Sequence, residues 1–139
     1  MPSNTGPEKK TPFYTLGEEI TNSITHGVGA GMAIAGMVVL LVQSNDVWQV
    51  VSSAIYGASM IFLFLMSCLY HALTNPTAKK VFRVFDHTSI FFLIAGTYTP
   101  FTLVTLRGWV GWTVFGVVWG VAVVGIVLNS ISVERFKKI

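Results

Sequence analysis

Charged residues are scarce in this sequence, and their scarcity points to the class of protein. Only 11% of the 139 residues are Asp, Glu, Lys or Arg, against about 25% in an ordinary soluble domain. Apolar residues make up 53% of the chain, and the mean hydropathy is +0.66. So few charges cannot cover a soluble core of this size, which argues against a soluble domain and favours a protein embedded in a bilayer.

Cysteine is also nearly absent. The single Cys68 excludes an internal disulfide, and its position inside an apolar run indicates a small packing residue. A polar leader at residues 1–17 precedes the first apolar run, which is longer than the apolar region of a signal peptide. We therefore expect this run to be an uncleaved membrane span.

Four long stretches contain no Asp, Glu, Lys or Arg: residues 20–45, 47–78, 87–106 and 108–133. A membrane-spanning helix needs about 20 mostly apolar residues. The sequence therefore predicts an all-α membrane protein, with a bundle over residues 18–133 and spans near 24–42, 50–70, 88–106 and 109–131. Connections of about seven, about seventeen and about two residues predict that consecutive helices are antiparallel neighbours.

The basic residues predict the topology. Every Lys and Arg except Arg107 lies before the first span, between the second and third spans, or in the tail at residues 134–139. By the positive-inside rule, both termini are expected in the cytoplasm and the protein in the plasma membrane. The net charge of +3 then reflects topology, so membrane lipids are the expected partners and nucleic acid is not.

Small residues recur at intervals of four, which predicts close helix packing and contact between copies of the chain as a homo-oligomer. They are Gly27, Gly31 and Ala35, then Ser53 and Gly57, then Gly116 and Gly120. Pro100 lies inside the third span, where it has no N–H to donate to the carbonyl of Gly96. A kink is therefore expected at Pro100.

Polar side chains within spans cost about 2.5–3.5 kcal/mol each on insertion scales and tend to mark functional sites. Here three helices bring such groups to one cytoplasmic depth: Glu19, Asn22 and His26; Ser67 and His71; Asp86 and His87. Imidazole and carboxylate groups suit Zn²⁺, whose bound water becomes a nucleophile near neutral pH. Each residue also has an ordinary interpretation, as a packing or solvent-facing histidine or, for Asp86, as a helix cap.

Three ordered motifs resemble the bacterial hemolysin III family, within the progestin and adiponectin receptor superfamily. They are Glu19-x-x-Asn22-x-x-Thr25-His26, Ser67-x-x-Tyr70-His71, and the run from Phe85-Asp86-His87 to Gly96-Thr97-Tyr98-Thr99-Pro100. The resemblance implies the first part of a seven-helix bundle with a cytoplasm-side zinc site. It assigns His71 to the metal, and Asp86 and Ser67 to catalysis. Glu19, Asn22, His26 and His87 are then supporting groups or alternative ligands.

The sequence departs from the family pattern in one respect. The family carries a His-x-x-x-His pair in its last span, and this chain has three His residues and no such pair. We therefore expect a chain truncated after its fourth span or a short relative, with an incomplete zinc site in one copy.

Three functions follow as hypotheses. The first is a zinc-dependent, membrane-embedded hydrolase that acts on a lipid amide or ester. The second is a non-enzymatic protein, receptor-like or concerned with membrane homeostasis, which the missing pair favours. The third is the cytolytic pore former that the family's name suggests. The apolar spans argue against this third role, because a secreted toxin must be soluble before it inserts.

Overall fold

The computed structural model describes residues 14–135 and is almost entirely helical. Its elements are α1 (Leu16–Gln43), α2 (Val47–Ala72), α3 (Pro76–Pro100), the π-helical segment η1 (Phe101–Leu106) and α4 (Gly108–Arg135). Within residues 14–135, four helices are long and apolar enough to cross a membrane, with η1 continuing α3 in the third of them. The predicted all-α membrane fold with four spans is therefore confirmed. Most of the expected leader and tail, residues 1–13 and 136–139, lies outside the described residues.

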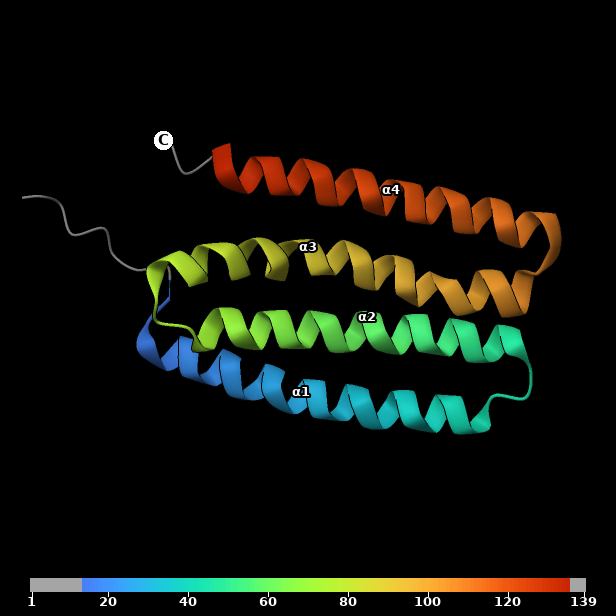
Figure 1. Cartoon of the computed structure of the whole chain (residues 1–139), viewed down its shortest axis with the longest axis horizontal. Helices are drawn as coiled ribbons and strands as arrows, with labels where there is room; N and C mark the ends of the chain where they lie inside the picture. The colour runs from blue at the N-terminus through green and yellow to red at the C-terminus, as the bar shows by residue number, and fades with distance from the viewer. Residues whose placement is uncertain (1–13, 136–139) are drawn as a thin grey trace, which may run out of the picture.

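The four helices lie antiparallel in one open row (Figure 1). In the described part of the chain, α1 packs on α2, α2 on α3 and α3 on α4, whereas α1 does not pack against α3 or α4. We call the end that holds Leu16, Ala72 and Pro76 the His71 end, and the end that holds the α1–α2 connection and Gly108 the Arg107 end.

The helix boundaries at the His71 end follow from local capping. Thr15 begins α1 through a capping box: its hydroxyl accepts from the backbone N–H of Glu18, and the Glu18 carboxylate accepts from the backbone N–H of Thr15 at 2.7 Å. Asn75 caps α3 by accepting from two backbone N–H groups, and Pro76 occupies the first turn. As a result, most of the connection expected between the second and third spans is helical.

The core between the helices consists of small hydroxyl residues and alanine. The side chains that are almost fully buried are Ser52, Ser59, Ser67, Ser89, Thr99 and Thr102. Ser59 and Thr99 show how their hydroxyls are satisfied, because each donates to a carbonyl of its own helix, at 2.7 and 2.8 Å. Large apolar residues lie outside instead, as expected for helices whose solvent is lipid.

Close approach of α2 and α3 depends on Gly96. A Cβ atom at this position would overlap the side chain of Ser59 across the interface. Gly57 of the predicted small-residue pattern has the same role against Met37 of α1. Gly116 and Gly120 differ, because a Cβ at either would meet open space. Gly57 and Gly96 therefore serve contacts within the row, whereas Gly116 and Gly120 do not.

The break expected at Pro100 takes the form of a change in helix type. α3 ends at Pro100, and the chain continues as η1 until Arg107, whose positive φ of 35° closes the segment. A proline disturbs the α-helical hydrogen-bond repeat, and single π-helical turns are a common way to absorb that disturbance. The wall of the bundle at the Arg107 end is therefore built from irregular helix.

Candidate functional site

Glu19 is the centre of the polar cluster at the His71 end. Its Oε2 accepts from Nδ1 of His71 at 2.7 Å, and its Oε1 lies 2.6 Å from Nζ of Lys79. The three side chains come from α1, α2 and α3, and the member from α3 is Lys79, where the sequence predicted Asp86 and His87. The pairing also stabilises a carboxylate that would otherwise be unpaired near the membrane.

His71 is buried and its orientation is fixed from several sides. The ring of Tyr70 lies 4.7 Å away between centroids, that of Tyr14 lies 5.3 Å away, and that of His26 lies 6.1 Å away. Because Nδ1 donates to Glu19, Nε2 keeps the lone pair of the neutral ring. A carboxylate on one ring nitrogen and a lone pair on the other is the arrangement found in both metal-binding and general-base histidines.

His26 and Ser67 form a second pair one helical turn deeper. Nδ1 of His26 and Oγ of Ser67 are hydrogen-bonded at 2.5 Å, and the His26 ring packs edge-on against Phe64. The sequence spacing predicts that Ser67 shares a face with His71, and both are buried on α2. The structure adds that the hydrogen-bond partner of Ser67 is His26.

Asp86 and His87 lie beside each other on α3. The Asp86 carboxylate is 3.4 Å from Nδ1 of its own neighbour His87, and the Asp86 carbonyl accepts from Ser89. Asp86 lies within electrostatic range of the Tyr70 hydroxyl, as does Glu19. Asn22 is half-buried on α1. Of the seven predicted residues, four form two pairs, His71 with Glu19 and His26 with Ser67. Asp86 and His87 lie beside each other on α3, and Asn22 belongs to neither pair.

Among residues 14–135, no group of three or more His, Cys, Asp or Glu side chains could hold a metal ion. A catalytic zinc site needs about three protein ligands and a water. His71 supplies one suitable imidazole, with Glu19 as the group that would orient it. The described residues thus do not fit a complete zinc site, although they fit one ligand of such a site.

Lys79 is a member of the cluster that the sequence did not predict, because a lysine between two spans is first interpreted as a charge that sets the topology. Besides pairing with Glu19, its Nζ lies 5.2 Å from the centre of the Tyr70 ring. The signal that would have found it is Asn75-Pro76, a helix start that places Lys79 one turn into α3 and beside the end of α2.

A cavity of about 540 Å³ opens beside this cluster. Glu19, His71 and Lys79 line its polar side, and the apolar residues that line the rest include Leu16, Ile20, Ile24 and Leu73. Leu16, Ile20 and Ile24 are exposed on the outer face of α1. The cavity therefore joins a polar floor to a surface that faces lipid, which suits an amphiphilic molecule.

Residues 14–139 match the family model described as haemolysin-III related. The chain belongs to this family. The resemblance carried by the three sequence motifs is therefore confirmed, and with it an integral membrane protein of the haemolysin-III type.

The family includes relatives from bacteria and animals. Hemolysin-3 of Bacillus cereus is 44% identical over 124 residues, which cover 87% of this chain and 57% of the relative. The hemolysin-3 homolog of Bacillus subtilis is 42% identical over 127 residues, covering 89% and 60%. The human monocyte to macrophage differentiation factor is 27% identical over 128 residues, covering 88% and 54%. The chain thus spans less than two thirds of these relatives, and no solved structure matches it.

Proposed function

We propose that this haemolysin-III family chain carries the site of a membrane-embedded hydrolase that acts on a lipid amide or ester. The observation that carries the proposal is the pair of buried His71 and half-buried Glu19 on the polar floor of a cavity that opens toward lipid. A lipid head would sit against the polar floor while its chains remain along Ile20 and Ile24.

The chemistry follows from the orientation of His71. Glu19 holds Nδ1–H, so Nε2 is the base that removes a proton from water as the water oxygen attacks the carbonyl carbon. The same nitrogen then returns the proton to the leaving alcohol or amine. Lys79 balances the charge of Glu19 throughout. The catalytic roles predicted for Asp86 and Ser67 stay predictions, with Asp86 beside His87 and Ser67 bonded to His26.

Zinc is part of the proposal only if further ligands, in addition to the described residues, complete its binding site. Zinc supplies a Lewis acid and a water of lowered pKa in such sites. In that case Nε2 of His71 would be a zinc ligand in place of the base described above, and Glu19 would fix the orientation of the ring. Measuring zinc in the detergent-purified chain beside the His71→Ala variant tests this part. Zinc near one equivalent that is lost in the variant supports it, and no zinc in either protein contradicts it for this chain.

The hydrolase is tested with fluorogenic lipid esters and N-acyl amides in mixed micelles. His71→Ala should lower turnover by about 10²–10⁴-fold, the range that a general base contributes. His87→Ala is the matched control and should leave turnover near that of the wild type. The adjacent residues Glu18 and Glu19 give a second matched pair. Glu19→Gln should reduce turnover because it removes the carboxylate that orients His71. Glu18→Gln should not, since Gln also serves in a capping box.

A non-enzymatic role is the alternative that a specific observation favours. The described residues do not assemble a three-ligand metal group, so the cavity at His71 would then bind a lipid without cleaving it, as in a receptor-like or membrane-homeostasis protein. If the wild type turns over no ester or amide but still binds a fluorescent lipid in a manner that His71→Ala abolishes, this alternative replaces the hydrolase.

Pore formation, which the names of the bacterial relatives suggest, is the third candidate. Purified protein added to erythrocytes, beside another four-span protein at equal detergent, tests it, and equal lysis by both rejects it. We further propose that both termini face the cytoplasm of a plasma-membrane protein, because in the described part of the chain the start of α3, at the His71 end, carries Lys79, Lys80 and Arg83, whereas the opposite end carries Arg107. Cysteine accessibility at the two ends of the row tests the orientation.

A further inference from the structure

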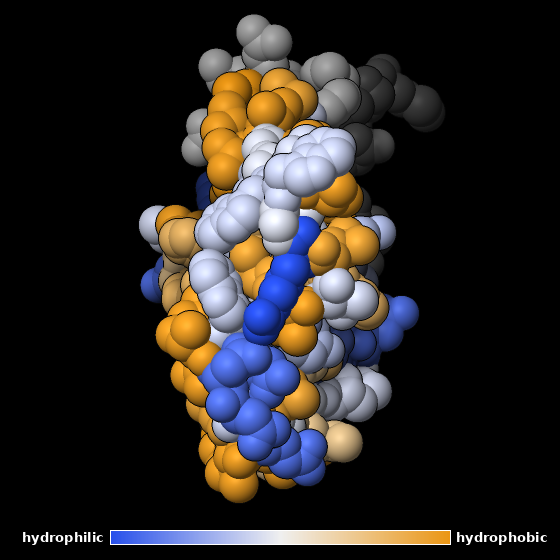
Figure 2. Space-filling model, turned by 90° about the vertical axis from the view of Figure 1, so that its right-hand side faces the viewer, coloured by the Kyte–Doolittle hydropathy of each residue, from blue (hydrophilic) through white to orange (hydrophobic). Residues whose placement is uncertain are grey.

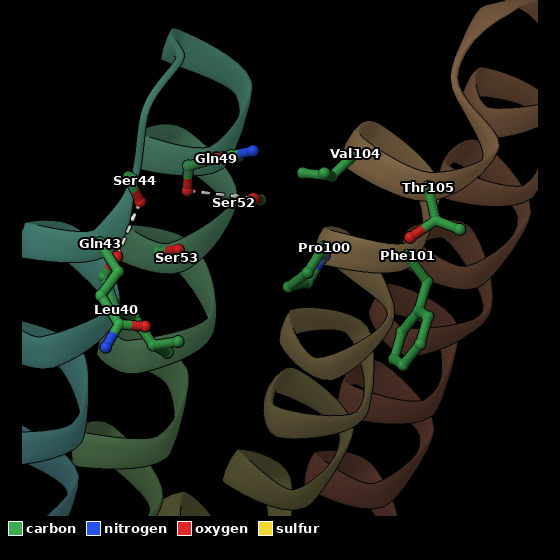
Figure 3. Close-up of a pocket in the computed structure, with 10 residues that line it drawn as sticks. All are labelled: Leu40, Gln43, Ser44, Gln49, Ser52, Ser53, Pro100, Phe101, Val104 and Thr105. Atoms are coloured by element: carbon green, nitrogen blue, oxygen red, sulfur yellow. Dashed lines mark hydrogen bonds between the residues drawn. The ribbon is translucent and has the colours of Figure 1, made fainter.

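A second cavity lies at the Arg107 end of the row, far along the helices from His71. It measures about 310 Å³ and is formed where α1 and α2 face the junction of α3 and η1 (Figure 3). Its lining residues are Leu40, Gln43, Ser44, Gln49, Ser52, Ser53, Pro100, Phe101, Val104 and Thr105. Hydrophilic surface crosses this end of the molecule between apolar flanks (Figure 2).

The lining offers hydrogen bonds in both directions. Oε1 of Gln49 accepts from the backbone N–H of Asn45 at 2.8 Å, which leaves the amide N–H₂ of Gln49 to extend into the gap toward Val104 (Figure 3). Ser44 and Ser52 donate to carbonyls of their own segments, so their oxygens keep lone pairs for a ligand. The cavity therefore presents amide donors and hydroxyl acceptors.

The lining contains no charged side chain. The charges nearest in sequence belong to Asp46 and Arg107, and these two pair with each other at 2.8 Å. An anion in the cavity would meet no available cation, and a cation would meet no available carboxylate. Since a charged group placed in a partly apolar site without a partner is strongly disfavoured, the fitting ligand is neutral.

The apolar part of the lining, Leu40, Pro100, Phe101 and Val104, includes residues exposed at the side of the row. Phe101 is 59% exposed and Leu40 is 37% exposed, so the mouth of the cavity is apolar. Trp48 and Trp112 pack edge-on at this end of the row, at the level expected for interfacial aromatic residues. The η1 wall is π-helical and ends in the positive φ of Arg107, and such irregularities concentrate at functional sites.

We propose that this cavity binds the uncharged hydroxyl head of a neutral glycerolipid of the diacylglycerol class. The head hydrogen-bonds to Gln49 and to the serines of α2, and the acyl chains leave past Phe101 and Leu40 into the bilayer. The site shares no lining residue with the cavity at His71, so it stands whether or not the chain is a hydrolase.

The test is photo-crosslinking of the 139-residue chain after it has been reconstituted into lipid nanodiscs. A diacylglycerol with a diazirine near the glycerol is compared with a phosphatidic acid that has the same chains and the same diazirine. Peptide mass spectrometry should place the diacylglycerol label on the segments around Gln49 and Val104. Phosphatidic acid should label these segments about tenfold less, as expected when one head fits and the other brings an unpaired charge.

Two variants separate binding in the cavity from general contact with lipid. Ser53→Leu fills the cavity from α2 and should reduce the diacylglycerol label about tenfold, whereas Ser130→Leu on α4, away from the cavity, should not. Val104→Phe fills the cavity from the η1 side and serves if Ser53→Leu does not fold. Equal labelling by the two lipids, or full labelling of either cavity variant, would overturn the proposal.

Discussion

Replacing Gly96 with alanine should separate α2 from α3. The added Cβ overlaps both the Cβ and the Oγ of Ser59, and rotating the Ser59 side chain moves only the Oγ out of the way. Insertion of a methyl group into a packed interface costs about 1–3 kcal/mol. Alanine returns at most about 1 kcal/mol through its better helix propensity. We therefore expect Gly96→Ala to destabilise the protein by up to about 2 kcal/mol in absolute terms, and by about 1–3 kcal/mol relative to a Gly→Ala change in open space, where the same propensity gain applies.

The assay is reversible unfolding by SDS in mixed micelles, followed by far-ultraviolet circular dichroism and tryptophan fluorescence. Gly116→Ala is the matched control, because its Cβ meets open space on α4. It should be neutral or stabilising by up to about 1 kcal/mol. Ser59→Gly in the Gly96→Ala background should recover most of the lost stability, since it removes the atoms that the new methyl meets. If Gly96→Ala is as stable as Gly116→Ala, the close packing of α2 on α3 is refuted.

Two further predictions concern charges at opposite ends of the row. The pKa of Asp46 lies below its ordinary value because the backbone N–H of Gln49 donates to its carboxylate, with Arg107 adding to the effect. A lowered folded-state pKa contributes stability that is present above the unfolded value and is lost as pH falls through the folded value, so Asp46→Asn should flatten the decline in Tm below about pH 4. At the His71 end, Lys79→Gln should destabilise the protein by about 1 kcal/mol more than Lys80→Gln, because only Lys79 pairs with Glu19; equal unfolding free energies for the two variants would contradict this pairing.

The sequence was sufficient for the number, type and direction of the helices, because apolar runs interrupted by charges are a strong signal in a membrane protein. It was weaker on where helices begin. The hydropathy of α3 rises only near residue 88, yet the helix starts at Pro76, since a cap and helix-forming residues extend it beyond the apolar window. The arrangement of the helices in an open row could not be predicted from the sequence. Periodicity indicates which face of a helix packs, but it does not indicate whether the fourth helix contacts the first.

For the site, spacing predicted that Glu19 and His71 lie at one depth, and the structure shows them in contact. Spacing cannot choose between partners that lie at similar depth, which is why the pairing of His26 with Ser67 emerged only from the structure. The contribution of Lys79 was missed for a related reason, since a lysine in a basic segment is expected in solvent unless a buried carboxylate lies within its reach.

The open row has a consequence for how the chain acquires its structure. In the described chain the backbone of each helix approaches only the helix before it and the helix after it. The Glu19–Lys79 ion pair is a side-chain contact between α1 and α3, so the packed interfaces lie between neighbours in sequence. Contacts of low sequence separation form quickly and need little loop closure. The chain can therefore add one helix at a time, each new helix finding its partner already in the bilayer. Assembly in the order of synthesis, without waiting for the C-terminal helix, is the pathway that this arrangement favours.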